Sequence, residues 1–100
     1  MTYTVIIGTR AKRDIRRAAK WLAKYSPKKA ARWHQGIEDA IFTLENNPFR
    51  CPLAVENEFF PIEIRQLLYE KYRVLYTVLD QEVHVLYVVH GARVFLKPED

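Results

Sequence analysis

The last third of the chain, residues 62–93, constrains the fold most, because three apolar runs are separated there by two short polar breaks. β-Branched and aromatic residues dominate each run, and the breaks are Glu70-Lys71 and Asp80-Gln81. Such runs are typical of β-strands, and such short breaks are typical of tight turns between antiparallel neighbours. The segment is therefore predicted to form a three-stranded antiparallel meander.

An arginine lies inside or at the end of each run, at Arg65, Arg73 and Arg93. Burying a guanidinium group without a partner costs several kcal/mol. We therefore expect a small sheet that carries three of them to keep one face open for an anion or an acidic partner.

Two amphipathic helices are predicted upstream of the meander. Thr9 is a plausible N-cap for a helix that runs through Tyr25, and Ser26-Pro27 caps and starts a second helix that ends at Asn46-Asn47-Pro48. Because the break between them is so short, they are expected to fold back as an antiparallel hairpin. Apolar stripes recur at three- and four-residue spacing, comprising Ala11, Ile15, Ala18, Leu22 and Tyr25 in the first helix and Ala30, Trp33, Ile37, Ala40, Ile41 and Leu44 in the second.

Residues 3–8 read as a first strand, and residues 49–61, which contain Pro52 and Pro61, read as an irregular loop. The predicted order is strand, helix, helix, strand, strand, strand, in a single domain over residues 1–100. This is an α+β fold in which the helical hairpin packs on one face of a small, mainly antiparallel sheet, leaving the other face open.

A two-residue turn at Asp80-Gln81 pairs Leu79 with Glu82, so odd positions of the third strand share a face with even positions of the fourth. The more polar set is predicted to line the open face: Arg73, Thr77, His84 and His90. In the second strand Glu63 and Arg65 join this face only if the connection at 69–71 holds an odd number of residues or a bulge.

Several of these residues have structural interpretations instead. Arg73 could form an ion pair with Glu63 or Glu82, and His84 could be a solvated strand residue. The two tryptophans, Trp21 and Trp33, are expected to be core aromatics of the helical hairpin.

Positive charge is concentrated near the start of the chain. Residues 1–37 contain ten Lys and Arg against one acid, whereas residues 38–100 contain six against eleven. A cationic stripe on the first helix is formed by Arg13, Arg17, Lys20 and Lys24, with Arg16 beside it. This stripe is either a binding face for an anionic partner or a solvated, solubilising surface.

The composition narrows the class of protein. Apolar residues make up 49 % of the chain, too many for a disordered protein. The single cysteine, Cys51, cannot form an internal disulfide, and no apolar run approaches the roughly 20 residues of a membrane span. The positive charges follow the first apolar residues, the wrong order for a secretory signal. We expect a cytoplasmic domain without a metal or cofactor, because the cysteine and three histidines lack ligand spacing.

Three motifs follow one another in the meander: Arg65-Gln66-Leu67, Tyr72-Arg73-Val74-Leu75-Tyr76 and Val89-His90-Gly91-Ala92-Arg93. Their order and spacing resemble the RelE/ParE superfamily of bacterial type II toxin–antitoxin toxins, which includes plasmid stabilization proteins. The resemblance implies the RelE/ParE-like fold and a toxin that a cognate antitoxin neutralises. It also implies that an extended, often acidic antitoxin segment lies on the helical hairpin and the sheet.

The resemblance implies one of two activities. RelE-like toxins cut messenger RNA on the ribosome without a metal, using sheet lysines and arginines with a tyrosine or histidine near the C-terminus. ParE-like toxins lack that set and inhibit DNA gyrase by binding. If this chain were a ribonuclease, its catalytic residues would be Arg65, Arg73, His90 and Arg93.

Two departures favour the ParE-like branch. Glu63 stands where a RelE-like toxin has a lysine, and the residues after Arg93 include neither tyrosine nor histidine. The chain is therefore predicted to be a gyrase inhibitor, with a RelE-like ribosome-dependent endoribonuclease and a non-toxic nucleic-acid-binding domain as alternatives. The residues predicted to contact the antitoxin or target are Arg13, Arg17, Lys20, Lys24, Arg65, Arg73 and Arg93.

Overall fold

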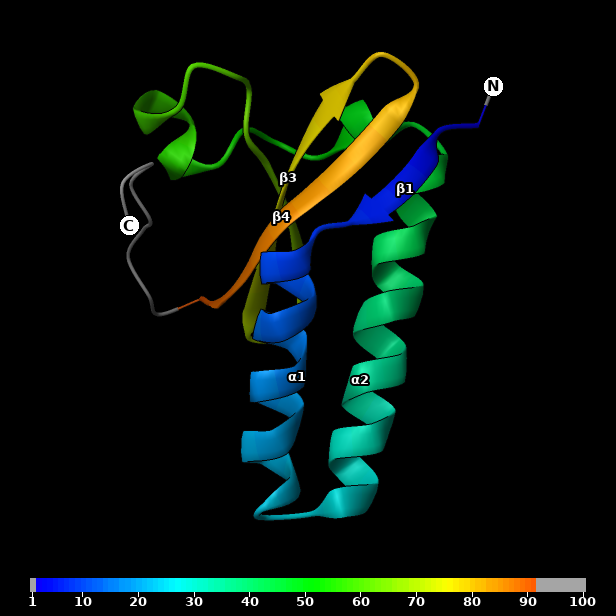
Figure 1. Ribbon diagram of the computed structural model, residues 1–100, viewed down its shortest axis with the longest axis vertical. Helices are drawn as coiled ribbons and strands as arrows, with labels where there is room; N and C mark the ends of the chain where they lie inside the picture. The colour runs from blue at the N-terminus through cyan, green and yellow to red at the C-terminus, as the bar shows by residue number, and fades with distance from the viewer. Residues whose placement is uncertain (1, 92–100) are drawn as a thin grey trace.

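The computed structural model describes residues 2–91, which form two helices and a four-stranded sheet (Figure 1). The elements are β1 (Thr4–Ile7), α1 (Thr9–Ala23), α2 (Pro27–Phe42), β2 (Arg65–Tyr69), β3 (Tyr72–Leu79) and β4 (Glu82–His90). Three short 3₁₀ helices lie between α2 and β2, namely η1 (Thr43–Glu45), η2 (Pro48–Arg50) and η3 (Val55–Phe59). The predicted α+β class and element order are confirmed.

The first helix follows β1 without a loop. Gly8, rather than Thr9, is its N-cap, and the helix ends at Ala23 instead of Tyr25. The Gly8 N–H donates to the Val85 carbonyl at 2.9 Å, and a Cβ at Gly8 would lie 2.9 Å from the same oxygen. This close approach requires a glycine and fixes the start of α1 against β4.

The second helix begins as predicted. Ser26 is the N-cap, its Oγ accepts the Lys29 N–H at 3.2 Å, and Pro27 takes the first helical position. The two helices pack side by side as an antiparallel hairpin (Figure 1).

The strand order is β1-β4-β3-β2, with β1 parallel to β4 and the other neighbours antiparallel. Both turns of the meander hold two residues, since Tyr69 pairs with Tyr72 and Leu79 with Glu82. The first residue of each turn, Glu70 or Asp80, has a positive φ, which lets so short a connection reverse the chain.

A β-bulge interrupts the pairing of β3 with β4. Tyr76 pairs with Val85, but Leu75 pairs with Tyr87, so Leu86 is an extra residue in β4. The predicted register therefore holds only between the turn and Tyr76. Beyond the bulge the two sides of β4 exchange, because side chains alternate along a strand and one residue has been inserted.

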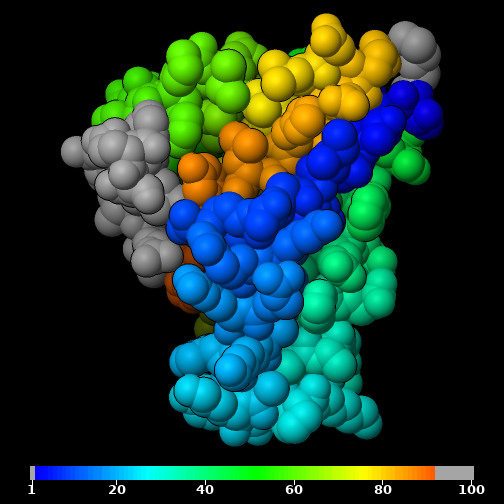
Figure 2. Space-filling model, in the orientation of Figure 1, coloured from blue at the N-terminus to red at the C-terminus, as the bar shows by residue number. Residues whose placement is uncertain are grey.

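The main core lies between the helical hairpin and one face of the sheet. Its largest members are Trp33, Ile37, Ile41, Leu44, Val74, Tyr76, Val83 and Val85. The hairpin also extends well beyond the sheet, so that its far end consists of the two helices alone (Figures 1 and 2). Trp33 is buried as predicted, whereas Trp21 is 53 % exposed and so does not belong to the core, which corrects the prediction for that residue.

The opposite face of the sheet is not open along its length, which corrects the prediction. Ala54 and Ile64, from the segment before β2, pack with Leu75 and Val89 as a second buried cluster. Two hydrogen bonds hold this segment in shape, from Ala54 N–H to the Ile64 carbonyl at 2.8 Å and from Ile64 N–H to Asn57 Oδ1 at 2.7 Å. Apolar packing covers the part of the face where the arginines were expected to lie open.

Candidate functional site

Arg73 is buried in an ion pair on that covered face. Its Nη1 lies 2.9 Å from Oε1 of Glu56 and its Nη2 lies 2.7 Å from Oε2, which gives two parallel hydrogen bonds. Gln66 Oε1 accepts a further bond from Arg73 Nη1 at 3.0 Å. Glu56 is fully buried and Arg73 is 9 % exposed. The hydrogen bond with Glu56 raises the pKa of Arg73 further, against the opposing effect of burial.

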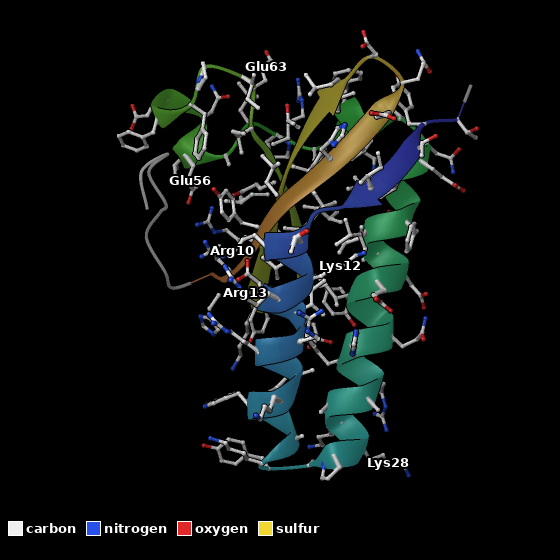
Figure 3. All side chains as sticks on the ribbon, viewed as in Figure 1. Arg10, Lys12, Arg13, Lys28, Glu56 and Glu63 are labelled. Carbon is white, nitrogen blue, oxygen red and sulfur yellow. The ribbon has the colours of Figure 1, made fainter. Side chains whose placement is uncertain are left out.

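The partner of Arg73 is therefore neither of the two carboxylates expected from the sequence. Glu56 comes from η3, whereas Glu63 is 65 % exposed and lies at the top of the view in Figure 3. Arg73 was also predicted to hold an antitoxin, target or phosphate on an open face. Its guanidinium instead binds the segment that covers the sheet.

Arg65 stabilises the same segment from another direction. Its Nη1 donates to the Cys51 carbonyl at 2.7 Å, its guanidinium lies over the Phe49 ring at 5.3 Å, and its Nη2 lies 3.4 Å from Glu63. Arg65 pairs with Tyr76 in the sheet, because the turn between β2 and β3 has an even number of residues. The Tyr76 side chain faces the hairpin, so the Arg65 side chain belongs to that side. Arg65 and Arg73 therefore belong to opposite sides of the sheet.

The two strand histidines are also separated. His84 pairs with Thr77 in the sheet and its Nε2 lies 3.0 Å from Glu82, while Thr77 itself is buried. His90 pairs with Tyr72 beyond the bulge, with its ring 5.2 Å from the Tyr72 ring. The prediction that His90 shares a face with Arg73 is wrong, since the bulge turns it towards the helices.

The proposed ribonuclease set is consequently dispersed. Arg73 lies on the covered face, Arg65 at the edge of the hairpin side, and His90 at the far end of β4. Arg93, the fourth predicted member, lies outside the described residues. Arg65 and His90 thus lie on the opposite side of the sheet from Arg73.

The cationic stripe of α1 is exposed as predicted, and its members are Arg13, Arg17, Lys20 and Lys24. Among residues 2–91, none of these four has an acidic partner within 4.0 Å. Arg10 differs, because it pairs with Asp14 at 3.1 Å and its guanidinium lies 5.1 Å from the centre of the Tyr87 ring. Figure 3 shows Arg10, Lys12 and Arg13 projecting from α1, with Lys28 at the far end of the hairpin.

A groove that the sequence did not predict lies beside this stripe. It consists of two adjoining hollows, of about 580 and 610 Å³, that share Trp21, Tyr72 and His90. Trp33 supports the Tyr72 ring at 4.9 Å, and burial raises the pKa of Tyr72. The available sequence signal was the position of Trp21, four residues from Arg17 and outside the apolar stripe of α1.

Residues 2–91 contain neither a membrane-spanning helix nor a metal-binding cluster. No helix in this range combines the length and apolar character needed to cross a membrane. Nor does this range bring together three or more His, Cys, Asp or Glu side chains in a way that could hold a metal ion.

The order of elements, the sheet topology and the helical hairpin can be compared with known proteins. Residues 5–95 match the family described as "ParE toxin of type II toxin-antitoxin system, parDE". The chain belongs to this ParE toxin family. The toxin is also 34 % identical to "Toxin RelE1" of Caulobacter vibrioides over 92 residues, which cover 91 % of this chain and 96 % of the relative.

Two solved structures share the fold of this ParE-family toxin. One is from the chromosomal ParDE system of P. aeruginosa, with a TM-score of 0.73 and 17 % identity, covering 89 % of this chain and 96 % of that chain. The other is from the toxin–antitoxin complex RelBE2 of Mycobacterium tuberculosis, with a TM-score of 0.57 and 27 % identity, covering 90 % and 99 %. The protein is a type II toxin–antitoxin toxin of the RelE/ParE superfamily.

Proposed function

We propose that this toxin acts by binding DNA gyrase rather than by cutting RNA, and that a cognate antitoxin neutralises it. The observation that carries the proposal is the buried pair of Arg73 with Glu56. A phosphoryl-transfer transition state needs cations aimed at the developing charge. A carboxylate on two of the guanidinium nitrogens of Arg73 occupies the place that a substrate phosphate would need.

The residues predicted to transfer protons are also poorly placed for that role. Cleavage by a 2′-hydroxyl requires a base and an acid within hydrogen-bonding reach of the reacting oxygens. His90, the one candidate from the sequence, faces the hairpin, and Arg65 donates to a backbone carbonyl. Arginine also stays protonated at neutral pH and makes a poor proton shuttle. These placements support a toxin that binds without catalysis.

The alternative is a RelE-like endoribonuclease, which the printed name of the Caulobacter relative favours. Expression of the full chain without an antitoxin separates the two. A gyrase inhibitor should arrest growth, induce the DNA-damage response and, when purified, accumulate cleaved DNA in a gyrase reaction. Growth arrest with cleaved transcripts and no DNA damage would reject our proposal in favour of the ribonuclease.

For the antitoxin we propose an acidic segment that contacts the cationic stripe of α1. Electrostatic steering would speed its association, and apolar anchors would supply most of the affinity. Reversing Arg13, Arg17 and Lys20 to glutamate should slow association and flatten its salt dependence. A matched reversal of Lys12, Lys28 and Arg32 makes the same change in net charge at exposed residues outside the stripe. Equal association rates for the two triple variants would contradict a localised binding face.

A further inference from the structure

The groove beside α1 brings three aromatic rings together at the end of the sheet. The Tyr72 ring contacts the rings of both Trp33 and His90, with ring centres 4.9 and 5.2 Å away. Trp21 lines both hollows from the helix opposite and remains 53 % exposed. The groove therefore presents an exposed indole beside rings that packing holds in position.

Cations surround these rings. Arg10 and Arg17 line one hollow, and Lys29 and Lys71 line the other. The acidic lining residues are Asp14 and Glu70, and both oxygens of Asp14 are engaged, one by Arg10 and one by the Val88 N–H at 3.0 Å. The exposed stripe of α1 continues the positive surface outward from Arg17. The lining thus carries an excess of positive charge next to an apolar, aromatic floor.

We propose that this groove binds a single strand of nucleic acid, with a base stacked on Trp21 and the backbone phosphates held by the surrounding cations. Stacking rings combined with a cationic track is how proteins bind single strands without reading sequence. Each nucleotide carries a flat ring and a negative charge in one unit, so it uses both features of the groove at once. An acidic peptide carries its rings and charges on different residues and fits the combination less well.

This site is separate from the face that holds Arg73, and it goes beyond the proposed action on gyrase. It requires the purified toxin to bind a strand with no other protein present. The test is fluorescence anisotropy of labelled oligothymidylate and oligouridylate of about 12 nucleotides, which distinguishes DNA from RNA. We expect binding of at least one strand, quenching of tryptophan fluorescence, and a steep loss of affinity between about 50 and 200 mM salt. A duplex of matched length should bind more weakly, because its bases are not available to stack.

Matched variants locate the site. Trp21→Ala should weaken binding of the strand by about tenfold, as expected for one lost stacking contact, and Trp21→Phe should restore much of it. Phe42→Ala, which removes another exposed aromatic from the hairpin, should leave binding unchanged. Arg17→Gln should weaken binding more than Arg16→Gln, since Arg17 lines the groove whereas Arg16 lies on the other flank of α1. Circular dichroism of each variant confirms that it is folded.

Several results would overturn the proposal. Failure of both oligonucleotides to bind at low salt would remove it, as would equal affinity for the strand and the duplex. Equal losses from Arg17→Gln and Arg16→Gln would indicate diffuse attraction to the helix surface without a groove. Binding of an acidic peptide that depends on Trp21, with no competition from the oligonucleotides, would assign the groove to a protein partner.

Discussion

The pair between Glu56 and Arg73 should dominate the response of this protein to a single substitution. Glu56→Ala removes a fully buried carboxylate and leaves the guanidinium of Arg73, which is 9 % exposed, without this counter-charge. Removing one partner of a buried ion pair costs about 3–5 kcal/mol. The whole free energy of unfolding for a domain of 100 residues is about 5–15 kcal/mol, so the loss is a large fraction of it.

Thermal and urea unfolding measure this loss directly. For a domain of this size each kcal/mol shifts the Tm by about 4–8 °C, so a loss of about 3–5 kcal/mol in Glu56→Ala should lower the Tm by about 12–40 °C. Glu63→Ala is the matched control, because that carboxylate is 65 % exposed and lies 3.4 Å from Arg65. An exposed pair contributes about 0–1 kcal/mol, so the control should change the Tm little.

A double variant separates the attraction within the pair from the cost of removing only one of its two charges. Replacing both Glu56 and Arg73 with methionine should recover most of the stability lost in Glu56→Ala, because apolar residues of similar volume can replace a buried ion pair at little cost. If Glu56→Ala cost less than about 1 kcal/mol, the Arg73 guanidinium would be reaching water. The sheet face would then not be closed to water by η3.

Three further predictions concern the hairpin side of the sheet. Tyr76→Phe should cost about 1–3 kcal/mol in urea unfolding, because the buried Tyr76 hydroxyl donates to the Pro48 carbonyl, which would lose its partner. Burial raises the pKa of Tyr76 and of Tyr72, so as the pH rises the unfolded chain loses these protons before the folded protein does. These two tyrosines should therefore leave the free energy of unfolding unchanged below about pH 10 and lower it above that pH. The decrease should be less steep in Tyr76→Phe. Gly8→Ala should lower the Tm, at a cost of about 1–3 kcal/mol, because the alanine Cβ would lie 2.9 Å from the Val85 carbonyl oxygen. An unchanged Tm would show that the backbone between β1 and α1 can shift to accommodate a Cβ.

The elements and most of the fold could be predicted because local patterns determine them. Ser26-Pro27 specifies the start of α2 through a capping hydrogen bond and a fixed φ, and the polar breaks of the meander specify its two turns. Those signals act over a few residues and do not depend on the rest of the chain. The hairpin on one sheet face then follows from covering apolar surface.

The site could not be predicted in the same way. The extra residue Leu86 places His90 on the side of the sheet opposite to the predicted one. The sequence of an apolar run does not show where such a residue is inserted. Glu56 is one of several acids near a segment without periodicity, so the sequence does not say which one reaches Arg73. Nor does the sequence show which part of α1 the rest of the fold covers, so it does not reveal that Trp21 is exposed.

The parallel pairing of β1 with β4 has a consequence for synthesis. Val5 pairs with Val83 and Ile7 with Val85, so β1 is made long before its partner strand β4. At about 5–20 residues per second, a ribosome needs about 4–15 s to pass from one strand to the other. During this interval the nascent chain can form its helices but cannot complete the sheet, because contacts this distant in sequence close last. The sheet of the toxin can therefore close only after β4 has been synthesised.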